Sequence, residues 1–279
     1  MTGSVERFRT FALIVVLLAA ACTPRAGEPS VTMPATASAL AVAPDFSGTI
    51  WAATGKRVYR SHDGGHSWRV VPGRGGATGV AFLSTRVVTV GARGVQTGGF
   101  GAATLRAPRP VGVPLVAVAT PYYRTSRLYG IDAQGRLWVS VRNAARWGRL
   151  RAAGLPAGAV AVAAIRDDVH KPDTIYVACG ANGLWRSRDF GATFQRVAAA
   201  GQATAVAATT DDQRLLLIAS PQGIELSRNR GHTFTHTSSA GDVSAIAFDL
   251  RNWRLAYAST SGGRLLRSDD GGRSWDTGS

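Results

Sequence analysis

The segment Ser187-Arg-Asp189-Phe-Gly191-Ala-Thr193-Phe194 carries a pattern that recurs along this 279-residue chain and decides its fold. The pattern reads S-x-[DN]-x-G-x-[ST]-[WF], and a short β-type run precedes every copy. Its acidic or amide side chain accepts hydrogen bonds from the turn backbone, its glycine supplies a positive φ, and its aromatic ring packs over the turn. The other copies are Ser61-His-Asp63-Gly-Gly65-His-Ser67-Trp68, Ser227-Arg-Asn229-Arg-Gly231-His-Thr233-Phe234 and Ser268-Asp-Asp270-Gly-Gly272-Arg-Ser274-Trp275. Each copy is predicted to be a tight turn between two neighbouring strands.

The spacing of these copies indicates a structural repeat. Ser187, Ser227 and Ser268 begin copies that lie 40 and 41 residues apart, whereas 126 residues separate Ser61 from Ser187. The longer gap has room for two more copies. Six units with a mean period of about 41 residues match the length of a four-stranded propeller blade.

Both missing copies are visible in degraded form. One runs from Ser140 to Trp147 at the usual offset, with Arg142 in the place of the Asp. The other begins at Thr97 and has glycine at the third and fifth places, without an Asp or a terminal aromatic. We therefore expect six units, two of which have weakened turns.

The rest of each unit supports the same architecture. Upstream of the complete copies lie a strand of small residues and then a second apolar strand, as in 204–208 and 215–219. Small side chains suit innermost strands, which are crowded near the axis of a propeller. The prediction is an all-β protein: a single β-propeller at 41–279 with six four-stranded blades. The ring is expected to close through core packing, or through strand exchange with the N-terminal segment.

The N-terminus has the features of an export signal. Residues 1–21 contain the basic Arg7 and Arg9 and then an apolar run that is too short to span a membrane. The run ends in Leu18-Ala-Ala-Ala-Cys22, which resembles a bacterial lipobox and makes Cys22 the predicted lipid-attachment residue. Two lipid chains suffice for stable anchoring. The alternative is ordinary signal-peptidase cleavage, which releases a soluble protein. Residues 22–40, rich in Pro, Ser and Thr, are predicted to be a flexible tether.

The repeated segments resemble the Asp-box, or BNR, repeat of sialidases, of the sortilin luminal propeller and of proteins similar to photosystem II assembly factors. The resemblance covers about 45–279. It implies a propeller whose boxes lie at the blade edges, away from the ligand face, so that the box residues are structural. It says little about function, because the repeat occurs in proteins with different activities.

A sialidase-type active site is not expected. That family pairs a nucleophilic Tyr with a Glu and clamps its substrate with three Arg residues, the first of them in an F-R-I-P-like motif. No such motif precedes the first box, and after the export signal the only glutamates are Glu28 and Glu225. No catalytic residue is therefore assigned. Candidate ligand contacts are Tyr122, Tyr123 and Arg124, which form an aromatic and basic loop with a solvated turn as the alternative interpretation.

Paired aspartates raise the alternative of glycoside cleavage. The pairs Asp167-Asp168 and Asp211-Asp212 each follow an innermost strand, and Asp45 and Asp249 fall in the same register of other units. Residues that recur in this way are expected to be turn residues.

Neither a metal nor a cofactor is expected. Cys179 lies in an apolar strand-like run and is interpreted as a small buried residue, and it has no partners at the spacing of zinc ligands. The net charge of +15 favours anionic surfaces, but only two of the 32 basic residues are lysines, which is typical of arginine-rich coding bias. The charge therefore does not name a partner.

The resulting hypothesis is an exported, monomeric lipoprotein, anchored at the extracytoplasmic face of the cell membrane through Cys22. It is expected to be a binding scaffold for an unidentified protein or glycan, or for envelope assembly, without catalysis. No nucleic-acid partner is expected. One alternative is a diverged glycoside hydrolase, which requires carboxylates clustered at the axis. Another is a polyanion-binding module, which requires arginines concentrated on one part of the surface and binding that weakens with salt.

Overall fold

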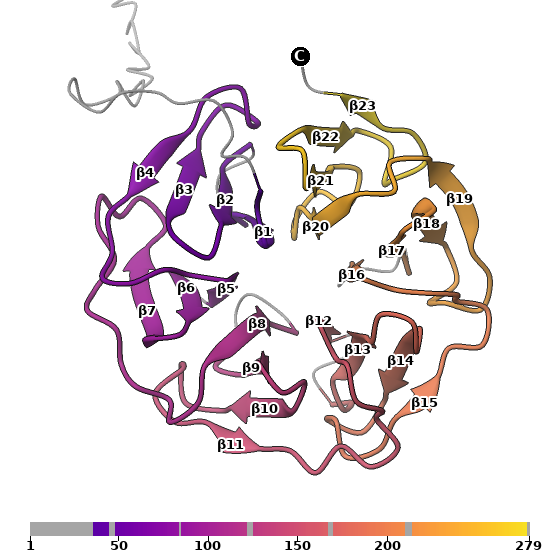
Figure 1. Ribbon diagram of the computed structural model, residues 1–279, viewed down its shortest axis with the longest axis horizontal. Coiled ribbons are helices and arrows are strands. Elements are labelled where there is room, and N and C mark those ends of the chain that lie inside the picture. Colours follow the sequence, from indigo (N-terminus) through magenta and orange to yellow (C-terminus); the bar gives the residue numbers. More distant parts are fainter. Residues whose placement is uncertain are drawn as a thin grey trace, which may run out of the picture.

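The computed structural model describes residues 36–44, 48–83, 85–121, 125–166, 170–209 and 214–277. Within these residues the regular structure is all β, and no helix is present that is long and apolar enough to cross a membrane. Six antiparallel sheets surround a central axis as the blades of a propeller (Figure 1). The predicted fold class and the number of blades are confirmed.

Each blade is a meander in which neighbouring strands follow one another in sequence. Blade 1 has β1 (Ala39–Val42), β2 (Ile50–Ala53), β3 (Val58–Ser61) and β4 (Arg69–Val71); blade 2 has β5 (Gly79–Leu83), β6 (Arg86–Gly91) and β7 (Gly94–Gly99); blade 3 has β8 (Leu115–Ala119), β9 (Leu128–Asp132), β10 (Leu137–Ser140) and β11 (Gly148–Arg149). Blade 4 has β12 (Ala161–Ile165), β13 (Thr174–Ala178), β14 (Leu184–Ser187) and β15 (Gln195–Arg196); blade 5 has β16 (Ala205–Ala208), β17 (Leu216–Ser220), β18 (Gly223–Ser227) and β19 (Thr235–Ser238); blade 6 has β20 (Val243–Phe248), β21 (Ala256–Thr260), β22 (Leu265–Ser268) and β23 (Asp276–Thr277).

Blade 2 departs from the four-stranded pattern of the other five. Its sheet has three strands, and a single bridge between Val95 and Arg109 stands where an outer strand would pair. The segment around that bridge contains Pro108 and Pro110, which have no N–H to donate to a ladder. The degraded box that precedes it also lacks the aromatic residue that packs over the turn in the complete copies.

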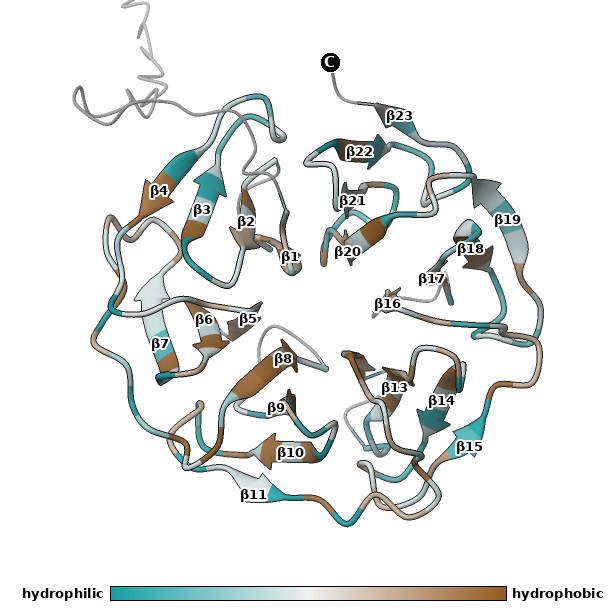
Figure 2. Ribbon diagram, in the orientation of Figure 1, coloured by the Kyte–Doolittle hydropathy of each residue, from teal (hydrophilic) through white to brown (hydrophobic). Residues whose placement is uncertain are grey.

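The core lies between the blades. Six buried apolar clusters each combine residues of two neighbouring blades. The innermost strands surround the axis, and Figure 2 shows β8 as hydrophobic and the outer strand β15 as hydrophilic. The cluster that joins blade 6 to blade 1 includes Leu40, Trp68, Tyr257 and Leu265. Since β1 pairs with β2 of its own blade, core packing closes the ring.

The two faces of the propeller carry different connections. The turns between third and fourth strands lie beside the loops between first and second strands, as the bonds from Gly64 N to Gly48 O (2.9 Å) and from Gly271 N to Arg254 O (2.7 Å) show. We call this the box face. The opposite face carries the hairpins between second and third strands and the crossovers between blades, and we call it the hairpin face.

Candidate functional site

The four complete boxes form a closed set of hydrogen bonds on the box face. In blade 4 the Ser187 hydroxyl donates to Asp189 Oδ1 (2.6 Å) and accepts the N–H of Gly191 (2.8 Å). Thr193 donates its N–H to Asp189 Oδ1 (3.0 Å) and its hydroxyl to Asp189 Oδ2 (2.5 Å). The boxes that begin at Ser61 and Ser268 make the same bonds. In the box that begins at Ser227, an asparagine stands in for the aspartate and its Nδ2 donates to the threonine hydroxyl.

These hydrogen bonds keep the box aspartates ionised. Burial by itself raises the pKa of Asp189, but the bonds from Ser187 and Thr193 outweigh it and lower the pKa to about 2. The pKa of Asp270 is lowered to about 2 by the equivalent bonds from Ser274 and Ser268, again against burial. A carboxylate held in this way does not donate a proton near neutral pH.

The box in blade 4 provides a direct stability test. Replacing Asp189 with alanine removes the acceptor of three hydrogen bonds and is expected to lower the free energy of unfolding by about 1–3 kcal/mol. Asp189→Asn is the matched control, because Asn229 already forms the corresponding turn in blade 5. Urea unfolding of both variants checks this, and equal destabilisation by alanine and asparagine would show that the hydrogen bonds are not the cause.

The degraded box of blade 3 keeps the turn but loses its bonds. Asn143 and Ala144 have positive φ values of 51° and 64°, as the fourth and fifth places of the complete boxes do. The buried Ser140 hydroxyl has no hydrogen-bond partner, because Arg142 replaces the aspartate. Tertiary packing therefore holds this turn without the side chains that stabilise it elsewhere.

The axis offers no polar chemistry among the described residues. A cavity of about 110 Å³ is lined there by residues of the innermost strands and by Thr120 and Leu250, which follow two of these strands. All of the lining residues are apolar except Thr120. Proton transfer and metal binding both need several polar groups, and the described lining residues supply only the hydroxyl of Thr120.

A buried ionic cluster ties blade 3 to blade 4. The fully buried carboxylate of Asp173 accepts hydrogen bonds from Tyr129 Oη (2.8 Å), Arg166 Nε (2.7 Å) and Arg127 Nη1 (3.2 Å). Burial, together with the negative charge of Asp173, raises the pKa of Tyr129, so its phenol stays protonated and donates. Sequence reasoning missed this cluster, because its members are separated by up to 46 residues.

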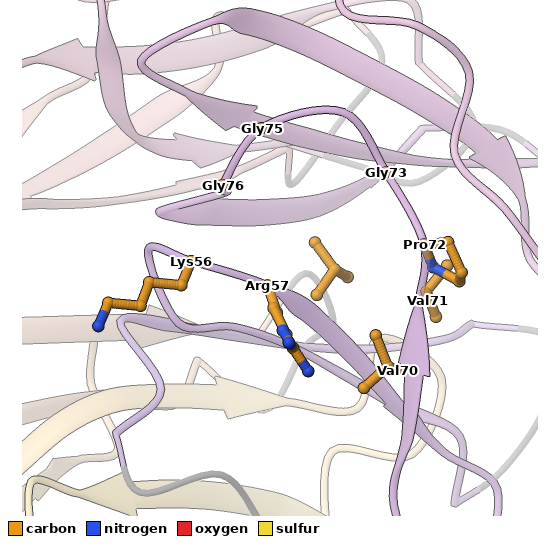
Figure 3. A pocket seen from close by; sticks show the side chains of 9 residues that line it. Lys56, Arg57, Val70, Val71, Pro72, Gly73, Gly75 and Gly76 are labelled. Carbon is orange, nitrogen blue, oxygen red and sulfur yellow. The ribbon is translucent and has the colours of Figure 1, made fainter. Parts of the chain in front are cut away.

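A larger cavity, of about 320 Å³, lies on the hairpin face between blades 1 and 2. Figure 3 shows the hairpin that carries Lys56 and Arg57 on one side of it and the glycine-rich crossover on the other. Its lining residues are Lys56, Arg57, Val58, Val70, Val71, Pro72, Gly73, Gly75 and Gly76. Both cations are exposed. The sequence signal that could have indicated this region is the absence of acidic residues between Asp63 and Asp132.

Several residues predicted from the sequence lie outside the described part of the chain. These are Cys22, Tyr122, Tyr123 and Arg124, together with Asp45, Asp167, Asp168, Asp211 and Asp212. Asp249, the described member of that aspartate register, is buried and accepts the N–H groups of Arg251 (2.8 Å) and Asn252 (3.1 Å), as a turn residue does.

Cys179 is a free, buried thiol, and burial raises its pKa to about 11. A thiol with so high a pKa is a poor nucleophile near neutral pH. The described residues contain no group of three His, Cys, Asp or Glu side chains that could hold a metal ion.

No protein-family model matches this chain, and no curated protein matches it. Several solved structures match it. A structure described as YCF48 bound to D1 peptide is 14% identical, with 90% of this chain and 84% of that chain covered and a TM-score of 0.55. The structure of U3-55K is 12% identical, with 88% and 81% covered and a TM-score of 0.58. The GH74 enzyme of Niastella koreensis is 18% identical, with a TM-score of 0.56; the match covers 86% of this chain but spans only 38% of the enzyme.

At these identities the similarity shows the fold alone. It agrees with the resemblance to Asp-box propellers that the repeated segments carry. Specific relationships to sialidases and to sortilin stay predictions. The chain is a six-bladed β-propeller whose fold is shared with YCF48 and with the propeller portion of GH74 enzymes.

Proposed function

We propose that this protein is an exported, membrane-anchored β-propeller that binds a protein or glycan partner and performs no catalysis. The observation that carries the proposal is how the box aspartates and Asp173 are bound. The box aspartates are bound within their own turns, and Asp173 is bound within an inter-blade cluster. A glycoside hydrolase needs carboxyl groups that face the substrate and exchange protons with it.

The apolar axial channel supports the same proposal. Among the described residues that line the axis, only Thr120 is polar, so we expect partners to be contacted through the faces and edges of the propeller. The structure of YCF48 bound to D1 peptide provides a precedent, because that propeller, of comparable length, binds a peptide. The likeness to the GH74 enzyme of Niastella koreensis and to an ancestral GH74 enzyme spans only 38% and 37% of those chains, so it supports the fold and no activity.

The path of the N-terminal segment is consistent with anchoring at Cys22. Thr36 donates its hydroxyl to Ser261 O (3.0 Å), and Ser244 donates to Ala37 O (2.8 Å), so the segment enters on the hairpin face of blade 6. Fourteen residues separate Cys22 from Thr36 in sequence number, which limits the reach of a tether to about 50 Å. A lipid at Cys22 would hold the propeller close to the membrane.

The test is a crosslinking pull-down from intact membranes. It uses the tagged full-length chain, a Cys22→Ala variant that should lose its lipid, and Cys179→Ala as a matched control that removes the buried thiol instead. We expect one specific partner to be recovered with the wild type and the control, and to be lost with Cys22→Ala. Equal recovery with all three chains would contradict the role of the anchor. Release of cleaved glycan fragments by the purified wild type would contradict the absence of catalysis.

A further inference from the structure

Five cationic residues form a continuous surface on the hairpin face of blades 1 and 2, which we call the basic ridge. They are Lys56, Arg57, Arg74, Arg93 and Arg109, and all five are exposed. Lys56 and Arg57 lie on the hairpin of blade 1, and Arg93 lies on the hairpin of blade 2. Arg74 and Arg109 lie on the crossovers that follow these blades.

Close backbone contacts join the segments that carry the ridge. A Cβ placed on Gly76 would lie 1.6 Å from the carbonyl oxygen of Gly55, so the first crossover rests directly on the hairpin of blade 1. A Cβ on Gly75 would lie 2.6 Å from Cδ of Arg93, so the Arg93 side chain crosses the same segment. Val95 and Arg109 exchange backbone hydrogen bonds of 2.9 and 2.8 Å. The five cations therefore belong to one contiguous surface.

The charge of this half of the propeller is not balanced. Residues 64–166 contain fourteen arginines and a single acidic residue, Asp132. The side chain of Asp132 is fully buried and pairs with Arg136 at 2.7 Å, so it does not offset the ridge. Residues 170–279, by contrast, contain twelve cationic and ten acidic residues. The cations are thus spread almost evenly, and it is the scarcity of acidic residues in 64–166 that gives this part of the ring its excess of positive charge.

The 320 Å³ cavity opens beside the ridge. Its volume falls in the range of pockets that hold small ligands, roughly 300–1,000 Å³. Val58, Val70, Val71 and Pro72 supply apolar surface, and the cations stand on the hairpin side (Figure 3). One unit of a longer chain can enter the cavity while neighbouring anionic groups follow the ridge.

We propose that the basic ridge and its cavity bind a flexible linear polyanion, a chain with closely spaced phosphate or carboxylate groups. This deepens the proposed function and rests on it, since it names a ligand class for a binding propeller. A flat anionic membrane fits less well, because a planar array of headgroups does not enter the cavity between the hairpin and the crossover. A flexible chain can place one unit in the cavity and lay its neighbouring anionic groups along the ridge.

The test measures binding of two labelled chains, inorganic polyphosphate and polygalacturonate, to the purified full-length protein by fluorescence anisotropy. Binding of either chain supports the proposal, and the comparison identifies phosphate or carboxylate as the preferred group. If the polyanion contacts about four cations of the ridge, its affinity for the protein is expected to fall roughly 50-fold when the salt concentration rises from about 50 to 200 mM. Charge reversal of the ridge, Lys56→Glu with Arg57→Glu, Arg74→Glu and Arg93→Glu, is expected to weaken binding by about tenfold or more.

The matched control reverses the same number of exposed cations on the other half of the ring: Arg188→Glu, Arg196→Glu, Arg228→Glu and Arg264→Glu. It changes the net charge equally, and we expect it to weaken binding less than about threefold. Thermal unfolding verifies that both variants are folded. If the ridge variant does not fold, glutamine is used instead of glutamate at the four ridge positions.

Two results would overturn the proposal: equal weakening by the two variants, or no binding of either chain. In the second case, binding to vesicles that contain phosphatidylglycerol, measured in parallel, would identify a membrane as the ligand instead. If the protein does not bind the polyanions but the membrane pull-down still recovers its partner, the proposed function is retained. If the pull-down recovers no partner while polyanion binding is intact, the proposed binding of a partner at the membrane is rejected instead.

Discussion

Replacing Asp173 with alanine is expected to lower the free energy of unfolding by about 3 kcal/mol or more. The fully buried carboxylate accepts hydrogen bonds from Tyr129, Arg166 and Arg127, which come from two neighbouring blades. Its removal leaves a buried phenol and two guanidinium groups without their shared acceptor. The two arginine side chains are 27% and 21% exposed, so water screens part of the loss and places the effect at the lower end of the range for buried ion pairs.

Asp173→Asn is the matched control, because it keeps the shape and one acceptor oxygen but removes the charge. We expect it to be destabilising by less than alanine, since the Tyr129 hydroxyl can still donate to the amide oxygen. Urea unfolding measures both effects, with one common slope of unfolding free energy against urea concentration for all variants. If the alanine variant were as stable as the wild type, this cluster would not hold blades 3 and 4 together.

Replacing Gly76 with alanine is the second change with a large expected effect. Its Cβ would lie 1.6 Å from the carbonyl oxygen of Gly55, and both groups belong to the main chain, so neither can move aside by changing a rotamer. The hairpin and the crossover must separate, which strains the 2.6 Å bond from Gly55 N to Ala77 O. We expect a loss of about 3 kcal/mol, at the upper end of the usual cost of overpacking.

Gly99→Ala is the control for the Gly76 variant, because a Cβ at Gly99 meets nothing within 4 Å. It is expected to change stability by less than about 1 kcal/mol. Thermal unfolding of the two variants measures the difference. Because Gly76 also lines the hairpin-face cavity, a folded Gly76→Ala protein should bind polyphosphate more weakly than Gly99→Ala. Equal stability of the two variants would contradict the close approach of the two segments.

The turns and their number were predictable from the sequence because the interactions that make them are local. In each box the bonding groups lie two to four residues apart, as in Ser187, Asp189 and Thr193, so the pattern can be read without knowing the fold. The period of about 41 residues then predicts six blades, because one repeat is the length of one blade. Even the degraded copy at Ser140 could be found, because Ser140 and Trp147 keep the usual offset. The structure confirms that its turn has positive φ at the same places as the complete boxes.

The sequence by itself thus determined the all-β class, the positions of the box turns and the number of blades. Only the tertiary structure decided that blade 2 has three strands, that Asp173 joins blades 3 and 4, and that the ridge from Lys56 to Arg109 is continuous. These features depend on how neighbouring blades and crossovers pack against each other. Their partners lie tens of residues apart, and neither local propensity nor repeat spacing specifies which side chains meet across such a distance.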